Sequence, residues 1–162
     1  MATGQTLLQW VPLANQPPAT AYATLDTRNS HHVLDFDAST AEDAVFGGVL
    51  PRNYASGGVT VSIHWMATSA TTGNVVWTGA WERCNTDLDA DSFATGVDSA
   101  SAAANGTSGI LTVTTIAFTD GAQMDSVAVG ESFRFKITRK IADAGDDMAG
   151  DAEIMRCEVR ES

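Results

Sequence analysis

The sequence predicts an all-β protein: an antiparallel two-sheet sandwich, with a jelly roll as the favoured topology and an extended N-terminal arm. The segment 59–67 alternates strictly between apolar and polar side chains, which is the period of a half-buried strand. The segment 131–139 does the same, with Phe133, Phe135 and Ile137 on one face. No segment of helical period is longer than roughly two turns. A chain of 162 residues is long enough for one domain with a substantial core.

Residues 1–18 resemble an arm that precedes a single domain over residues 19–162. Its prolines at positions 12, 17 and 18 prevent a helix or a central strand. Its apolar residues, the candidate interface residues of the chain, are Leu7, Leu8, Trp10, Val11 and Leu13. Apolar arms of this kind pack either on a neighbouring subunit or back on their own domain, and the sequence leaves both alternatives open.

Two short strands are expected next, at 20–28 and 31–37, with Asn29-Ser30 as the turn between them. The run Ser39-Thr40-Ala41-Glu42-Asp43 resembles the start of a helix, of which one turn fits before Gly47-Gly48. The later strands are expected at 59–67, 74–83, 110–118, 131–139 and 152–161. About eight strands with long connecting loops favour a jelly roll over an immunoglobulin sandwich, whose Cys…Trp…Cys spacing is missing.

Charge and composition exclude several classes of partner. The net charge of −11 should repel DNA, so no nucleic-acid partner is expected. No apolar run approaches the roughly 18 residues that span a bilayer, so no membrane partner is expected either. The first residues lack the basic and apolar regions of a signal peptide, which predicts synthesis in a cytoplasm. Cys157 alternates with Met155 and Val159 and is interpreted as a small buried apolar residue, while a bridge to Cys84 stays open.

The most site-like cluster is a run of alternate carboxylates, Asp87, Asp89 and Asp91, which resembles the start of a calcium loop. Ser92 stands where that loop needs glycine, and the bidentate glutamate is missing, so a solvated acidic loop is the preferred interpretation. The acidic loop 142–151 could also supply oxygen ligands. We therefore expect no resident metal or cofactor.

Catalysis has little support in the sequence. His31 and His32 are adjacent on a strand and point to opposite faces, so they do not easily share a metal. His64 falls on the polar face of its strand, and there is no Gly-x-Ser-x-Gly elbow. Trp77 and Trp81 share one strand face, with Trp65 expected to pair across from them. These tryptophans either fill the core or form a platform for sugar rings, and the core is the preferred interpretation.

Three passages carry a resemblance to a known family: 50–58 with the Trp65 strand, 69–77 through Glu82-Arg83, and 130–139 with 151–153 and the closing strand to Glu161. Together they resemble small jelly-roll proteins encoded among the structural genes of tailed bacteriophages. The resemblance implies a non-enzymatic virion protein of the capsid decoration, or cement, type. Such a protein would sit on the capsid surface as a homotrimer and stabilise the lattice of the major capsid protein, its partner.

The expected mechanism follows from the arm. Leu7, Leu8 and Trp10 would grip a neighbouring subunit or the capsid lattice, and deletion of residues 1–14 would abolish particle binding without loss of the fold. The alternative function is a glycan-binding β-sandwich module of a phage tail or fibre. It would use Trp77 and Trp81, with calcium at residues 87–91.

Overall fold

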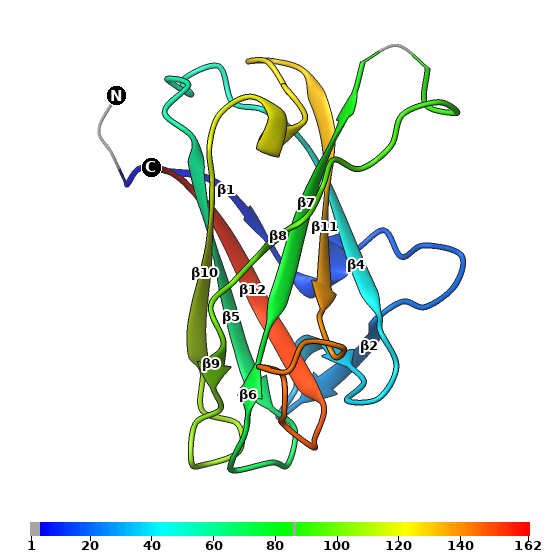
Figure 1. Ribbon diagram of the computed structural model, residues 1–162, viewed down its shortest axis with the longest axis vertical. Helices are drawn as coiled ribbons and strands as arrows, with labels where there is room; N and C mark the ends of the chain where they lie inside the picture. The colour runs from blue at the N-terminus through cyan, green and yellow to red at the C-terminus, as the bar shows by residue number, and fades with distance from the viewer. Residues whose placement is uncertain (1–3, 86) are drawn as a thin grey trace.

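The computed structural model describes residues 4–85 and 87–162 as two antiparallel sheets that face each other (Figure 1). The strands are β1 (Thr6–Trp10), β2 (Thr24–Arg28), β3 (His31–Phe36), β4 (Asp43–Val49), β5 (Val59–Ala67), β6 (Asn74–Val75), β7 (Trp77–Cys84), β8 (Val97–Asp98), β9 (Ala102–Ala103), β10 (Thr112–Phe118), β11 (Ser132–Arg139) and β12 (Ala152–Glu161). The helical segments of the described residues, η1 (Pro12–Ala14) and η2 (Ala122–Met124), are three residues each, so no helix there could cross a membrane.

The first sheet has the order β10-β5-β12-β3-β2, and β1 pairs with β12 as well. The second sheet has the order β4-β11-β7-β8, and β6 and β9 form a separate small pair. The chain passes from one sheet to the other between β3 and β4, β4 and β5, β5 and β7, β8 and β10, β10 and β11, and β11 and β12. The prediction of an all-β antiparallel sandwich is therefore confirmed.

The space between the sheets is filled with aromatic side chains. Trp65, Trp77 and Trp81 have no exposed surface, and the rings of Trp65 and Trp77 meet edge to face with 6.1 Å between centroids. Trp81 packs on Phe133 with 4.7 Å between centroids. The preferred interpretation that these tryptophans fill the core is therefore confirmed, and the alternative of a sugar platform at Trp77 and Trp81 is wrong, because both side chains of β7 face the core.

The N-terminal segment folds back on its own domain as β1, which runs antiparallel to β12. Trp10 is 4 % exposed and stacks on Phe46 and Phe135, with 5.3 and 5.4 Å between centroids. Trp10 therefore cannot be an exposed anchor for another protein, and the expectation of an arm that reaches a neighbour is corrected for this residue. Leu7 and Leu8 are half-buried against the same core. Only Val11 and Leu13, at 41 % and 63 % exposed, stay accessible.

The segment expected to begin a helix is instead the strand β4, which pairs with β11 over its whole length. Asp37 accepts hydrogen bonds from the backbone N–H groups of Ser39 and Thr40, so it closes a turn and not a helix. Gly48 lies so close to Phe133 that a Cβ at this position would come within 2.9 Å of the ring. Gly48 therefore reflects close packing inside the strand β4 and not the end of a helix.

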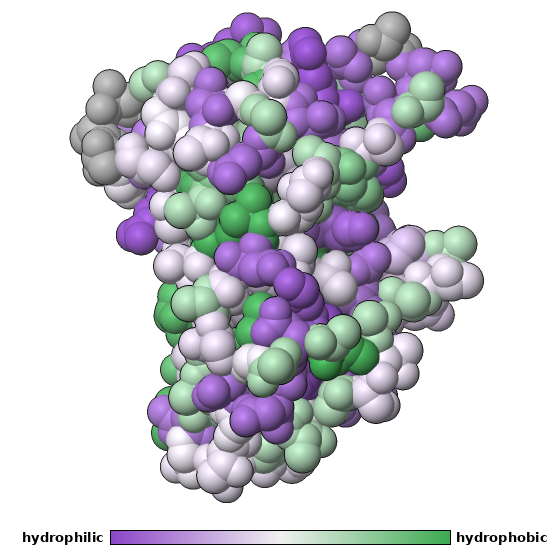
Figure 2. Space-filling view, viewed as in Figure 1, coloured by the Kyte–Doolittle hydropathy of each residue, from purple (hydrophilic) through white to green (hydrophobic). Residues whose placement is uncertain are grey.

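The remaining elements follow the sequence closely. The turn between β2 and β3 places Asn29 and Ser30 at positive φ, 47° and 63°, as expected for a tight hairpin. Cys157 is buried and both cysteines are unpaired, and burial raises the pKa of the Cys157 thiol. On the face seen in Figure 2, hydrophilic side chains gather on the projection at the upper right, where Figure 1 draws the loop between β7 and β8.

Candidate ligand-binding groove

The first sheet is interrupted where β12 changes its partner. The first part of β12 pairs with β3, with Ile154 opposite Leu34, and the later part pairs with β1, with Cys157 opposite Trp10. The register of β12 against β5 shifts between Ile154 and Arg156. A shift of this kind is a β-bulge, which re-aims side chains and is common beside functional sites. Met155 and Arg156 therefore lie in a gap between the ends of two strands.

A hollow of about 250 Å³ occupies this gap. Met155 and Arg156 line it from β12, His31 and His32 line it from β3, and Val11 to Leu13 close it from the end of β1. Both histidines are exposed. They are adjacent at the start of β3, and this hollow lies beside both of them.

A second hollow of about 370 Å³ adjoins the first and shares His31 and Met155 with it. Val33 and Met66 line it from the strands of the first sheet, and Ser108, Gly109 and Leu111 line it from the loop before β10. Val33 is fully buried and Met66 is 5 % exposed, so this hollow has an apolar floor.

Arg28 closes one end of the second hollow and holds the loop in place. Its Nη1 donates to the Glu153 carboxylate at 2.8 Å and to the carbonyl oxygens of Ala67 and Thr68. Its Nη2 donates to the Ser108 hydroxyl at 2.8 Å. Gly109 has a φ of +82°, and a Cβ there would come within 2.8 Å of the guanidinium. The loop therefore needs glycine at this position to pass over Arg28.

A third hollow of about 300 Å³ shares Pro12 and Leu13 with the first. Tyr22 lines this hollow and is 47 % exposed, and Asn15 and Thr24 add polar groups. The backbone around Tyr22 is fixed, because Ala23 N–H donates to the carbonyl of Asp43 and Asp43 N–H donates to that of Ala21. We call the three adjoining hollows the edge groove.

Carboxylates gather on the first sheet beside Arg28. Burial raises the pKa of Asp35 to about 6, and the neighbouring carboxylates of Asp151 and Glu153 add to the effect. The Thr68 hydroxyl donates to Asp35 at 3.3 Å and opposes the rise. Asp35 therefore becomes charged only near neutral pH, while Glu153 is paired with Arg28 at 2.8 Å.

The expected calcium residues do not converge on a site. The Asp87 carboxylate accepts the Asp89 N–H at 3.1 Å, and Asp91 lines a separate hollow beside Arg83 and Asp125. Across residues 4–85 and 87–162, no three histidine, cysteine or acidic side chains come together in a way that could hold a metal ion.

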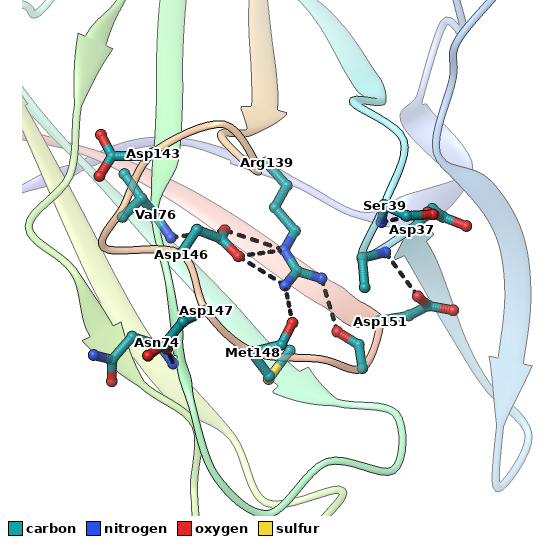
Figure 3. Close-up of polar contacts among 12 residues, drawn as sticks. Asp37, Ser39, Asn74, Val76, Arg139, Asp143, Asp146, Asp147, Met148 and Asp151 are labelled. Atoms are coloured by element: carbon teal, nitrogen blue, oxygen red, sulfur yellow. Dashed lines mark hydrogen bonds and ion pairs between the residues drawn. The ribbon is translucent and has the colours of Figure 1, made fainter.

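The acidic loop 142–151 uses its carboxylates to hold backbone (Figure 3). Asp146 accepts from Arg139 and from Val76 N–H, Asp147 accepts from Asn74 N–H, and Asp151 accepts from Ala38 N–H. These side chains point toward different partners, so the loop is a structural brace.

The edge groove was not predicted from the sequence. Met155 was expected on the same face as Cys157 and Val159, but the bulge places it on the outer face of the first sheet, beside Val33 and Met66. One local feature of the strand indicates the bulge. The core residues Ile154 and Cys157 have two residues between them, whereas strict alternation would place one residue between them.

The fold is similar to that of known jelly-roll carbohydrate-binding modules. The family 11 module from Clostridium thermocellum, solved with a β-1,3-1,4-mixed-linked tetrasaccharide, has a TM-score of 0.51 and 8 % identity over 100 % of this chain and 98 % of that one. The CBM22-2 xylan-binding domain of Paenibacillus barcinonensis Xyn10C has a TM-score of 0.50 and 12 % identity, covering 92 % of both chains. CBM35 from Cellvibrio japonicus Abf62 has the same score and identity over 88 % of this chain and 90 % of that one. No protein-family model and no curated protein matches the sequence.

Proposed function

We propose that this protein is a non-enzymatic carbohydrate-binding module and that the edge groove is its binding site. The observation that carries the proposal is the exposed Tyr22 ring in a groove that also presents hydrogen-bonding side chains. Ligand sites in proteins are typically concave, with an apolar lining and a few placed polar groups. Tyrosine offers a large apolar face and a hydroxyl, which suits a sugar ring with one apolar face and polar edges.

The three hollows share lining residues, so successive units of one glycan chain would fit into neighbouring hollows. The shared residues are His31 and Met155 at one junction and Pro12 and Leu13 at the other. Successive sugar units would contact the apolar floor at Met66, then the bulge, then the Tyr22 ring. The similarity to carbohydrate-binding modules supports this proposal through the fold, and the modules named above provide precedent for glycan binding on such a sandwich.

Isothermal titration calorimetry against a panel of soluble polysaccharides tests the proposal. We expect a dissociation constant of about 10 µM to 1 mM for at least one glycan, because a solvent-exposed groove offers few fully desolvated contacts. Tyr22→Ala should weaken binding at least about tenfold. Phe93→Ala is the matched control, since Phe93 is a half-exposed aromatic elsewhere, packed against Arg134 and Lys136. Absence of binding across the panel contradicts the function, and full binding by Tyr22→Ala contradicts the site.

The capsid-decoration function stays a prediction of the sequence resemblance, together with its homotrimer, its major capsid protein partner and its place on the virion. The exposed apolar side chains of Val11 and Leu13 are the residues of the N-terminal segment that could still serve such a contact. Deletion of residues 1–14 would remove β1 from the first sheet, so it no longer isolates an interface. Leu13→Asp with light scattering is the cleaner test: a trimer dispersed by this change favours the decoration function, and a monomeric wild-type protein argues against the trimer.

A further inference from the structure

The charged side chains that line the edge groove are all basic or histidine. Arg28, His31, His32 and Arg156 line its hollows, and none of the described residues lining it is a carboxylate. The chain as a whole carries 20 acidic and 9 basic residues. Glu153 pairs with Arg28, so among the described lining residues the arginine charge that no ion pair compensates is that of Arg156, which suits a ligand of negative charge.

Arg156 is the basic residue best placed to bind an anion. It is exposed at the bulge, and no ion pair involving it is found among the described residues. Opposite it on β5 lies His64, another group without negative charge. Arg28, in contrast, is already paired with Glu153 and is committed to the loop. The anion-binding capacity of the groove therefore lies at its centre, in the hollow between the strand ends.

No acidic group among the described residues forms an ion pair with Arg156. Glu153 pairs with Arg28, while Glu158 accepts from the Thr6 hydroxyl and Asp35 accepts from the Thr68 hydroxyl. A guanidinium with free donors binds planar carboxylates or sulfates through two parallel hydrogen bonds.

We propose that the edge groove selects an anionic polysaccharide, with Arg156 and His31 contacting its carboxylate or sulfate groups. This inference rests on the proposed function and adds the ligand class. The negative charge of the remaining surface would repel a polyanion elsewhere, so it would favour binding in the groove alone.

The experiment compares each acidic polysaccharide with a neutral copy of itself. Polygalacturonate and alginate are titrated alongside their carboxyl-reduced forms, and chondroitin sulfate alongside its desulfated form, at about 50 and 500 mM NaCl. We expect at least one acidic polymer to bind at least about tenfold more tightly than its neutral copy at low salt, and this preference to shrink at high salt. The carboxylate and sulfate arms identify which anion is recognised.

Variants locate the contact. Arg156→Gln should weaken binding of the acidic polymer about threefold to tenfold, the range of a lost charge-assisted contact, and should therefore reduce the preference for the acidic polymer over its neutral copy. Arg160→Gln is the matched control, because it removes the same charge from an exposed position on the same strand, outside the three hollows.

Each possible result of these experiments supports or overturns the inference. Equal affinity for acidic and neutral copies overturns the anionic selectivity and leaves the carbohydrate function standing. No binding to any polymer, charged or neutral, overturns both. If the protein is an oligomer that Leu13→Asp converts to monomers, the groove is an interface between copies, and the inference is wrong.

Discussion

Arg139, the last residue of β11, is fully buried although it carries a charge. Its Nη2 donates to the Asp146 carboxylate at 2.8 Å and to the Met148 carbonyl at 2.7 Å, and its Nη1 donates to the Gly150 carbonyl at 2.8 Å (Figure 3). A loop whose composition suggests an exposed turn is thereby folded around one guanidinium. Removal of one member of a buried, fully bonded pair leaves an uncompensated charge.

Arg139→Met should therefore destabilise the protein by about 3–5 kcal/mol, because Asp146 and two carbonyl groups lose their donor. Urea unfolding followed by circular dichroism measures the change. Lys140→Met is the control. Lys140 is the next residue and pairs with Asp98 and Asp143 at the surface, where solvent screens the attraction. The urea concentration at the midpoint of unfolding should therefore hardly change in this variant. Equal effects of the two changes would show that burial of Arg139 adds nothing.

Asp35 predicts a pH dependence of stability. Its pKa is about 6 in the folded protein, above the ordinary 3.8, so folding favours its protonated form. The native state therefore loses stability as pH rises from about 4 through 6, and the loss is complete above the folded pKa. Asp35→Asn removes this loss. It should stabilise the protein by about 1 kcal/mol at pH 7.5, a value discounted for solvent screening, and have no effect near pH 3.5.

Urea midpoints at both pH values measure the Asp35 effect. Asp89→Asn is the control with the same change of net charge, since Asp89 is exposed in the loop after β7. Should both variants gain equally at pH 7.5, relief of overall charge repulsion would be the cause and the local explanation would fail.

At the level of elements, β1 belongs to the core of the protein. Trp10 covers Phe46 and Phe135 from the second sheet, while its strand is bonded to β12 of the first. Trp10→Ala should cost about 3–5 kcal/mol, as large-to-small changes of buried aromatic residues do. Leu13→Ala, in the same segment but 63 % exposed, should be close to neutral. Thermal unfolding of both variants measures this, and a neutral Trp10→Ala would mean that β1 is not docked in solution.

The strands that the sequence predicts well are those whose side chains alternate between apolar and polar. Residues 59–67 and 152–161 were delimited correctly as β5 and β12, because a period of two identifies a strand without tertiary information, although β5 is buried on most of both faces. β4 was missed, because the run Ser39-Thr40-Ala41-Glu42-Asp43 resembles a helix N-cap with acids in the first turn, and the pair Gly47-Gly48 resembles the end of a short helix. Contact with Phe133 explains Gly48 and contact with Gln16 explains Gly47, and both contacts join distant parts of the sequence.

The burial of the tryptophans and the position of the edge groove were harder to predict from the sequence, because they too depend on contacts between distant segments. Alternation states that Trp77 and Trp81 share a face but not whether that face meets the other sheet or water. The edge groove joins Val11, His31 and Met155, which are far apart in the chain and meet only after β1 and β3 both dock on β12. Sequence patterns give the periodicity of each strand. The position of a site between strand ends depends instead on which strands pair and in which register.

At the scale of the whole molecule, the sandwich encloses all four tryptophans. Trp65, Trp77 and Trp81 are fully buried and Trp10 is 4 % exposed, and the Trp65 indole N–H donates to the Thr114 hydroxyl inside the core. Ligand binding in the edge groove leaves these rings out of contact with the glycan. Tryptophan emission is therefore a probe of folding for this protein and not of glycan binding.

Iodide quenching tests this enclosure. Iodide, a charged quencher, should have little effect on the native emission, for two reasons: the rings are buried, and the net charge of −11 repels anions. Unfolding in urea should make the emission sensitive to iodide. Val113→Trp supplies the positive control, because Val113 is 53 % exposed between two threonines and a ring there would be quenched in the folded state. Strong native quenching of the wild-type protein, comparable with that of the variant, would mean that the two sheets do not close over the aromatic core in solution.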